Sequence, residues 1–79
     1  MKELTAEEIE KALREGREIV VVSVYRNRDS AIWWAKGSGV YTFAKEIGVF
    51  KRKDSIEEAA KVLAGLQTDC NLLVRGNKD

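Results

Sequence analysis

The stretch EIVVVSVY, residues 18–25, decides how this chain folds. Six of its last seven residues are apolar and most are β-branched, which is typical of a strand buried on both faces. Such a strand would leave an aggregation-prone edge if it were not paired on both sides. We therefore predict that residues 19–25 form an internal strand, around which the rest of the chain is arranged.

Two helices flank the strands. Thr5 stands three residues before Glu8, which is the pattern of a capping box, and Gly16 marks the end of this first helix. The same start signal recurs at Ser55 and Glu58, which predicts a second helix over DSIEEAAKVLAGLQ, residues 54–67. The apolar residues at helical spacing are Ile9, Ala12 and Leu13 in the first helix and Ile56, Ala59, Ala60 and Leu63 in the second.

Short turns join the first strand to two more. AIWWAK, residues 31–36, follows the turn RNRDS, and GSG connects it to a third strand over VYTFAKEIGVFKRK, residues 40–53, with a bulge or bend at Gly48. CNLLVR, residues 70–75, is a fourth strand, which a crossover through the second helix returns parallel to the third strand and the first. The predicted fold is a single small α+β domain over residues 1–79. Its element order is αβββαβ: an antiparallel three-strand meander and a fourth strand in sheet order 3-2-1-4, two helices that can both lie on one face, and a polar tail at 75–79.

This order is similar to the first half of the ribonuclease-H-like fold. DSIEEAAKVL, residues 54–63, resembles the helix start of HicB-type antitoxins, which share that half-fold. Nucleases of the ribonuclease-H-like group hold metal ions with carboxylates on the first and fourth strands. IVVVSVY and NLLVR contain no carboxylate, so the resemblance does not imply nuclease activity here.

The residue types that catalysis needs are scarce. The chain has no histidine, and its only cysteine, Cys70, lies at the start of an apolar strand without an activating base. The acidic pairs at 7–8 and 57–58 fall in first helical turns, where they favour the helix dipole. KGSGVY, residues 36–41, lacks the spacing of a phosphate-binding loop. We expect no enzymatic activity, no catalytic or metal-binding residue, no cofactor and no small-molecule substrate.

Composition also bears on the cell compartment. No apolar run approaches the roughly 20 residues that cross a bilayer, and the acidic amphipathic N-terminal segment differs from a signal peptide. A lone cysteine fits a reducing compartment, so we expect a cytoplasmic protein without a membrane partner. The absence of histidine and proline, with 34% charged residues, indicates a thermophilic source.

The net charge of +1 conceals a basic middle segment. Residues 24–53 carry seven basic and two acidic side chains, whereas the segments on either side are each net acidic. Trp33 and Trp34 are adjacent in a strand, so one ring can serve the core while the other faces out, unless each lies under a helix. We expect the turn at 26–28 to meet the end of the third strand at one sheet edge, with Lys36 apart. The candidate binding surface comprises Arg26, Arg28, Lys51, Arg52, Lys53, Trp33, Trp34, Tyr41 and Phe43.

Two functions remain open. The first is a small non-enzymatic protein that acts through protein–protein interaction, as a homodimer or as an inhibitor or accessory factor of the kind that mobile elements and viruses encode. The second is a nucleic-acid-binding module that uses segment 24–53, because rings stack on bases and cations contact phosphates. The isoelectric point of 7.8 favours the first, since dedicated nucleic-acid binders tend to lie above about 9.

Overall fold

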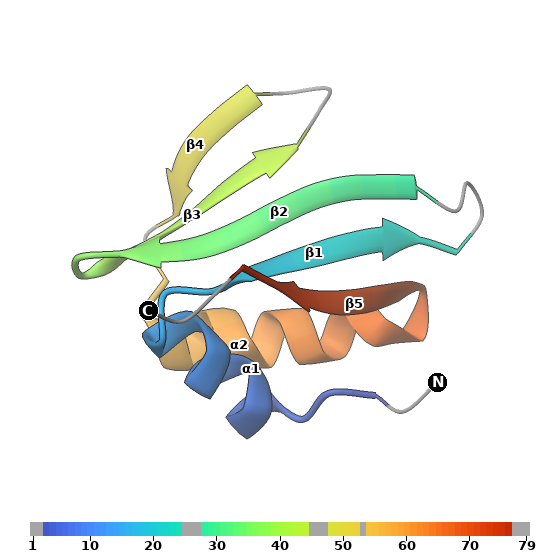
Figure 1. Ribbon diagram of the computed structural model, residues 1–79, viewed down its shortest axis with the longest axis horizontal. Coiled ribbons are helices and arrows are strands. Elements are labelled where there is room, and N and C mark those ends of the chain that lie inside the picture. The colour runs from blue at the N-terminus through green and yellow to red at the C-terminus, as the bar shows by residue number, and fades with distance from the viewer. Residues whose placement is uncertain (1–2, 25–27, 45–47, 53, 77–79) are drawn as a thin grey trace.

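A computed structural model describes residues 3–24, 28–44, 48–52 and 54–76 of the chain. All the strands join one antiparallel sheet in the order β4-β3-β2-β1-β5 (Figure 1). The elements in chain order are α1 (Ala6–Arg14), β1 (Glu18–Ser23), β2 (Arg28–Lys36), β3 (Gly39–Ala44), β4 (Gly48–Arg52), α2 (Ile56–Gly65), the short 3-10 helix η1 (Leu66–Thr68) and β5 (Cys70–Arg75). The protein is thus a small compact α+β domain with five strands, where the sequence predicted four.

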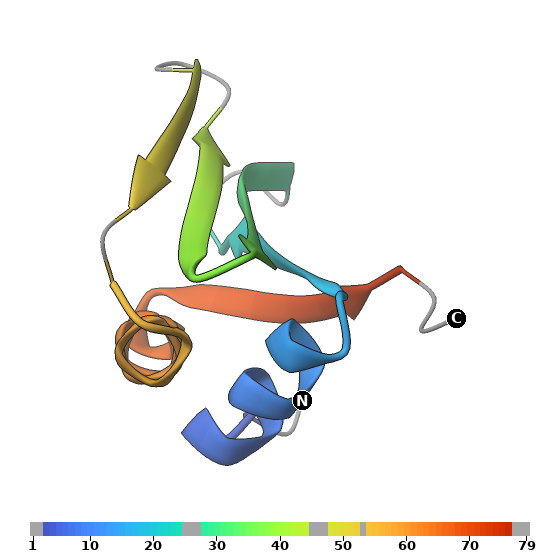
Figure 2. The ribbon, with the colours of Figure 1, turned by 90° about the vertical axis from the view of Figure 1, so that its left-hand side faces the viewer.

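Both helices lie on the same face of the sheet, beneath β1 and β5 (Figures 1 and 2). Among the described residues, their apolar stripes and one face of the sheet form a single core of eleven buried side chains. Its members are Ile9, Ala12 and Leu13 of α1, Ala59, Ala60 and Leu63 of α2, and Ile19, Val21, Trp33, Val40 and Leu72 of the strands. No helix in the described part of the chain is long and apolar enough to span a membrane.

The predicted internal position of the first strand is confirmed. β1 pairs with β2 on one side and with β5 on the other, and both pairings are antiparallel. Val20 and Val21 at its centre are 1% and 4% exposed. A register shift after Val21 in the pairing with β2 is accompanied by a hydrogen bond of 3.1 Å, in which the Ser30 hydroxyl donates to the Val21 carbonyl.

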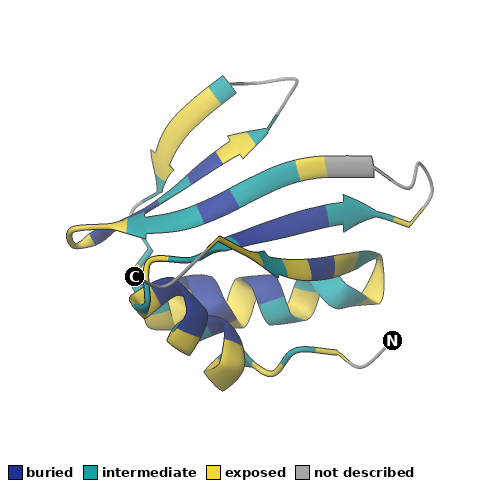
Figure 3. Ribbon diagram, in the orientation of Figure 1, coloured by how far each residue is buried: buried dark blue, intermediate teal, exposed yellow. Residues whose placement is uncertain are grey.

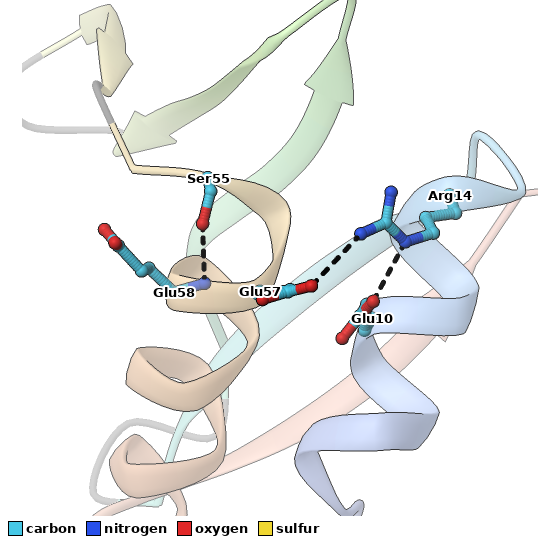
Figure 4. Close-up of polar contacts among 5 residues, drawn as sticks. All are labelled: Glu10, Arg14, Ser55, Glu57 and Glu58. Carbon is cyan, nitrogen blue, oxygen red and sulfur yellow. Dashed lines mark hydrogen bonds and ion pairs between the residues drawn. The ribbon is translucent and has the colours of Figure 1, made fainter.

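The predicted helix starts and the end of the first helix at Gly16 are confirmed as well, whereas α2 ends at Gly65 and η1 follows it. The Glu8 backbone N–H donates to the Thr5 hydroxyl at 3.1 Å, and the Thr5 N–H donates to the Glu8 carboxylate at 2.9 Å, which completes the capping box. Gly16 ends this segment with a φ of +81°, a conformation that glycine adopts without strain. The Ser55 hydroxyl accepts from the Glu58 N–H at 3.1 Å and caps the start of α2 (Figure 4).

The third predicted strand is wrong, because residues 40–53 form a hairpin of two strands. Ala44 of β3 pairs with Gly48 of β4, and only residues 45–47, which lie outside the described residues, separate the two. Gly48, the first residue of β4, has a φ of +89°, a conformation that glycine adopts without strain. A glycine expected to bend one strand therefore begins a new one.

Because β4 is an additional strand, the chain enters α2 from the opposite end of the sheet to the one predicted. β5 consequently runs antiparallel to β1, so its predicted parallel pairing is wrong, as is the resemblance in topology to the ribonuclease-H-like half-fold. Its place beside β1 is as predicted. The predicted strand CNLLVR is β5 with the same bounds, so Arg75 belongs to the strand and not to the polar tail, whose residues 77–79 lie outside the described ranges.

Polar side chains connect the two helices. The guanidinium of Arg14 in α1 contacts Glu10 at 2.9 Å and reaches Glu57 of α2 at 4.0 Å (Figure 4). These groups are largely exposed, so their contribution to stability is small. A stronger link lies beyond α2: the Gln67 side chain accepts a hydrogen bond from the Leu4 N–H at 2.9 Å and donates to the Leu4 carbonyl at 2.7 Å. Gln67 thus holds the segment before α1 against the end of α2.

Candidate binding face

The sheet face opposite the helices carries a continuous line of apolar side chains. Successive residues of a strand point to opposite faces, so the register of the four strand pairs assigns each residue to a side. Across all five strands, the residues that oppose one another on this open face are Leu73, Val20, Ile32, Phe43 and Val49. We call these five residues the apolar row.

Charged and aromatic side chains flank the apolar row on one side. The rings of Trp34 and Tyr41 stack with centroids 5.8 Å apart and planes 14° apart. Lys51 lies beside Tyr41 in the register, and Glu18 lies beside Arg75, whose guanidinium it contacts at 3.1 Å. These charges all lie at one end of the sheet, where β1 and β3 begin and β2 and β4 end. Among the side chains that the structure describes, the charges of the open face are confined to this end.

Much of the apolar row is open to solvent. Phe43, Val49 and Leu73 are 38%, 62% and 48% exposed, and Figure 3 shows β4 exposed over most of its length. A shallow groove of about 340 Å³ lies on this face, with Ile32, Trp34, Phe43 and Val49 among its walls. Exposed apolar side chains that gather on one face are characteristic of interaction sites.

The two tryptophans have different environments. Trp34 belongs to the open face, whereas Trp33 faces the helices and is only 6% exposed. The Arg52 guanidinium lies 4.7 Å from the centre of the Trp33 ring and forms an ion pair with Asp54 at 2.8 Å. Of the two alternatives that the sequence left open, the structure has one ring inside and one on the open face, and Trp33 is therefore not part of the exposed surface.

The expected basic cluster is not formed. Arg28 begins β2, and Lys51 and Arg52 end β4, at opposite ends of the sheet. The reason is the additional strand, which returns the chain to the end of the sheet where β1 begins. Lys36 was predicted to lie apart from the basic cluster. It instead lies at the end of the sheet that holds Lys51, because Gly39, its register partner, is packed against the Lys51 side chain. Arg26 and Lys53 lie outside the described residues.

Sequence reasoning found the aromatic members of the open face but not the aliphatic ones. Tyr41 and Phe43 both point to this face, as expected for alternate residues of one strand. Ile32, Val49 and Leu73 were missed, although the alternation in GVFKR would have placed Val49 and Lys51 together once this segment was assigned to its own strand.

Other chemistry is sparse in the described ranges. No group of three or more histidine, cysteine, aspartate or glutamate side chains there is arranged to hold a metal ion. Cys70 is partly buried at the start of β5. Comparison of the chain with protein-family models, with curated proteins and with solved structures gives no match, so the candidate site rests on the geometry of the open face alone.

Proposed function

We propose that this chain is a non-enzymatic binding protein that holds a protein partner on the open face of its sheet. The observation that carries the proposal is the apolar row, which crosses all five strands on the face opposite the two helices. Burial of apolar surface contributes about 25 cal/mol for each Å² removed from water, so a partner that covers this row gains free energy from its exposed members, Phe43, Val49 and Leu73.

The chemistry of the face favours a protein over a small molecule or a nucleic acid. Its groove is shallow, whereas small-molecule sites are concave and bury most of their ligand. Four of the five members of the apolar row are aliphatic and offer no ring on which a base can stack. The cations lie at one end, where Arg75 is paired with Glu18.

Binding of single-stranded nucleic acid is a second candidate. Trp34, Tyr41 and Phe43 share the open face, and Lys36 and Lys51 lie at its charged end. Rings with cations beside them form the usual platform for unpaired bases. The two functions predict different ligands for the same residues.

Capture experiments with matched variants separate these functions. Phe43 and Phe50 are 38% and 39% exposed and lie on opposite faces of the sheet, so Phe43→Glu disrupts the open face and Phe50→Glu is its control. The immobilised variants are offered an extract of cells that produce the protein and, separately, a labelled single-stranded oligonucleotide.

The proposal expects that the unmodified protein and Phe50→Glu retain the same protein, which can be another copy of the chain, and that Phe43→Glu loses it. Retention of one protein set by all three forms would contradict the proposal. Retention of the oligonucleotide, abolished by Phe43→Glu, would establish the second candidate in its place.

A further inference from the structure

We propose that the partner on the open face is a second copy of the chain, packed face to face around a two-fold axis that runs along the apolar row. This inference rests on the proposed function, because it names the occupant of the same surface. The size of the face, the position of its charges and the symmetry of the row support a second copy as the occupant.

The projected area of the face is somewhat smaller than the area that a stable dimer takes from each partner, and its side chains add to it. Five strands about 4.8 Å apart, each about six residues long at about 3.3 Å per residue, cover roughly 24 by 20 Å, or about 480 Å² in projection. Side chains that stand out from the sheet raise the accessible area above this projected value. Stable interfaces take about 600 Å² or more from each partner. The total accessible surface of the chain is 5481 Å², so covering this face would remove a substantial part of it from water.

The charges select the orientation of the two copies. The apolar row contains no charged residue, and Glu18, Lys51 and Arg75 all lie on the same side of it. An axis parallel to the strands would lay the cation-rich end of one copy on the same end of the other. An axis along the row instead carries the two charged ends to opposite sides of the interface, where they stay in water and do not repel.

The symmetry of the row closes the assembly. With the axis along the row, each residue of the row faces its own counterpart, so Phe43 lies near Phe43 of the second copy and Val49 near Val49 of the second copy. Such an isologous contact covers the open face of both copies and leaves no open face for a third. Two aligned sheets that pack through apolar side chains form a common core arrangement in proteins.

The first test is the molar mass of the purified chain at high micromolar concentration, measured by size exclusion with light scattering. We expect twice the 8.9 kDa of one chain for the unmodified protein and for Phe50→Glu, and 8.9 kDa for Phe43→Glu. Circular dichroism checks that each variant is folded. If Phe43→Glu does not fold, Val49→Lys takes its place, with Val62→Lys on α2 as control, because both valines are exposed, at 62% and 42%.

The second test is the axis. In a Cys70→Ser background, Val49→Cys is expected to join two chains through a short bismaleimide, and Val62→Cys is not. A dimer whose Val49→Cys form is not joined in this way would overturn the proposed axis.

The mass measurement also separates this inference from the function on which it rests. One chain at every concentration would overturn the second copy as occupant, and the capture experiment then decides whether a different protein binds the face. A dimer that persists in both Phe43→Glu and Val49→Lys would place the interface elsewhere and would overturn the inference.

Discussion

Trp33 lies on the helix-facing side of β2, and the Arg52 guanidinium lies 4.7 Å from the centre of its ring. The alternation of a strand was enough to place Trp33 and Trp34 on opposite faces. The Arg52 guanidinium over the Trp33 ring could not be predicted, because Arg52 reaches that ring only through β4, a strand that the sequence did not reveal.

The contact between Arg52 and Trp33 has a measurable effect on stability. Arg52→Ala removes the cation from the indole face and the ion pair with Asp54, and we expect the free energy of unfolding to fall by about 1 kcal/mol. Urea denaturation followed by tryptophan fluorescence measures this change. Lys51→Ala, the neighbouring residue on the opposite face, is the control and should cost less than about 0.5 kcal/mol. Equal effects of the two variants would show that the contact contributes nothing.

Two glycines should respond to alanine with opposite signs. Gly48 has a φ of +89°, so Gly48→Ala places a side chain in a strained conformation and should destabilise the fold by about 1 kcal/mol. Gly65 is the last residue of α2 and has open space around it, so Gly65→Ala should stabilise the protein by up to about 1 kcal/mol. Thermal unfolding of both variants gives the comparison. A Gly48→Ala protein as stable as the unmodified one would contradict the role of the positive φ.

Among the helices and strands, the sequence patterns that depend on neighbouring residues predicted the structure correctly, whereas the direction in which distant strands pair was predicted wrongly. The caps at Thr5 and Ser55 depend on contacts within a few residues, and the apolar run of β1 requires burial in any arrangement. The division of residues 40–53 into β3 and β4 leaves a weaker trace. The connection KEI lacks the Asn-Gly or Asp-Gly pair that most clearly marks a hairpin, and a glycine in a strand also fits a bulge.

The central and edge strands should differ in hydrogen exchange. β1 is paired on both sides, so the amides of Val20, Val21 and Val22 should be among the slowest in the chain. β4 is paired only with β3, so amides of Val49 or Phe50 that face away from β3 should exchange much faster. Exchange followed by nuclear magnetic resonance resolves these residues. Rapid exchange at Val20 and Val21 would contradict the observed sheet order.

Gln67 should determine how firmly the segment before α1 is held. Gln67→Ala removes its hydrogen bonds to the Leu4 backbone, and we expect a loss of about 1–2 kcal/mol together with faster exchange of the Leu4 amide. Gln67→Glu keeps the acceptor but loses the donor to the Leu4 and Ala64 carbonyls, so it should also destabilise. Thr68→Ala removes only an exposed bond to Gly65 and is the control. An unchanged Leu4 amide in both Gln67 variants would contradict this role.

At the scale of the whole molecule, the binding face joins residues that are far apart in the chain. Val20 and Leu73 are neighbours in the apolar row although 53 positions separate them in the sequence, and Val49 is reached only through the second hairpin. Composition predicted an aromatic and basic segment, which contains the rings of Trp34, Tyr41 and Phe43. The row itself depends on the register of four strand pairs, which no local pattern determines.

The same topology weakens the case for duplex DNA as a ligand. A cluster of five cations would give log affinity a slope of about −4 to −5 against log salt, at about 0.9 for each phosphate contact. The structure separates Arg28 from Lys51 and Arg52 by the length of the sheet, and Arg52 is engaged by Asp54 and Trp33. We therefore expect weak binding with a slope shallower than about −2, carried by Lys36 and Lys51.

Fluorescence anisotropy of a short labelled duplex, titrated from low to physiological salt, measures this slope. Lys36→Gln with Lys51→Gln should remove the weak binding, whereas Arg28→Gln should leave it unchanged, because Arg28 lies at the other end of the sheet. A slope near −4 that becomes shallower in Arg28→Gln would show that cations from both ends of the sheet act together on one duplex. The open face would then be the smaller part of the function, since a ligand that spans both ends of the sheet is recognised by charge and not by the apolar row.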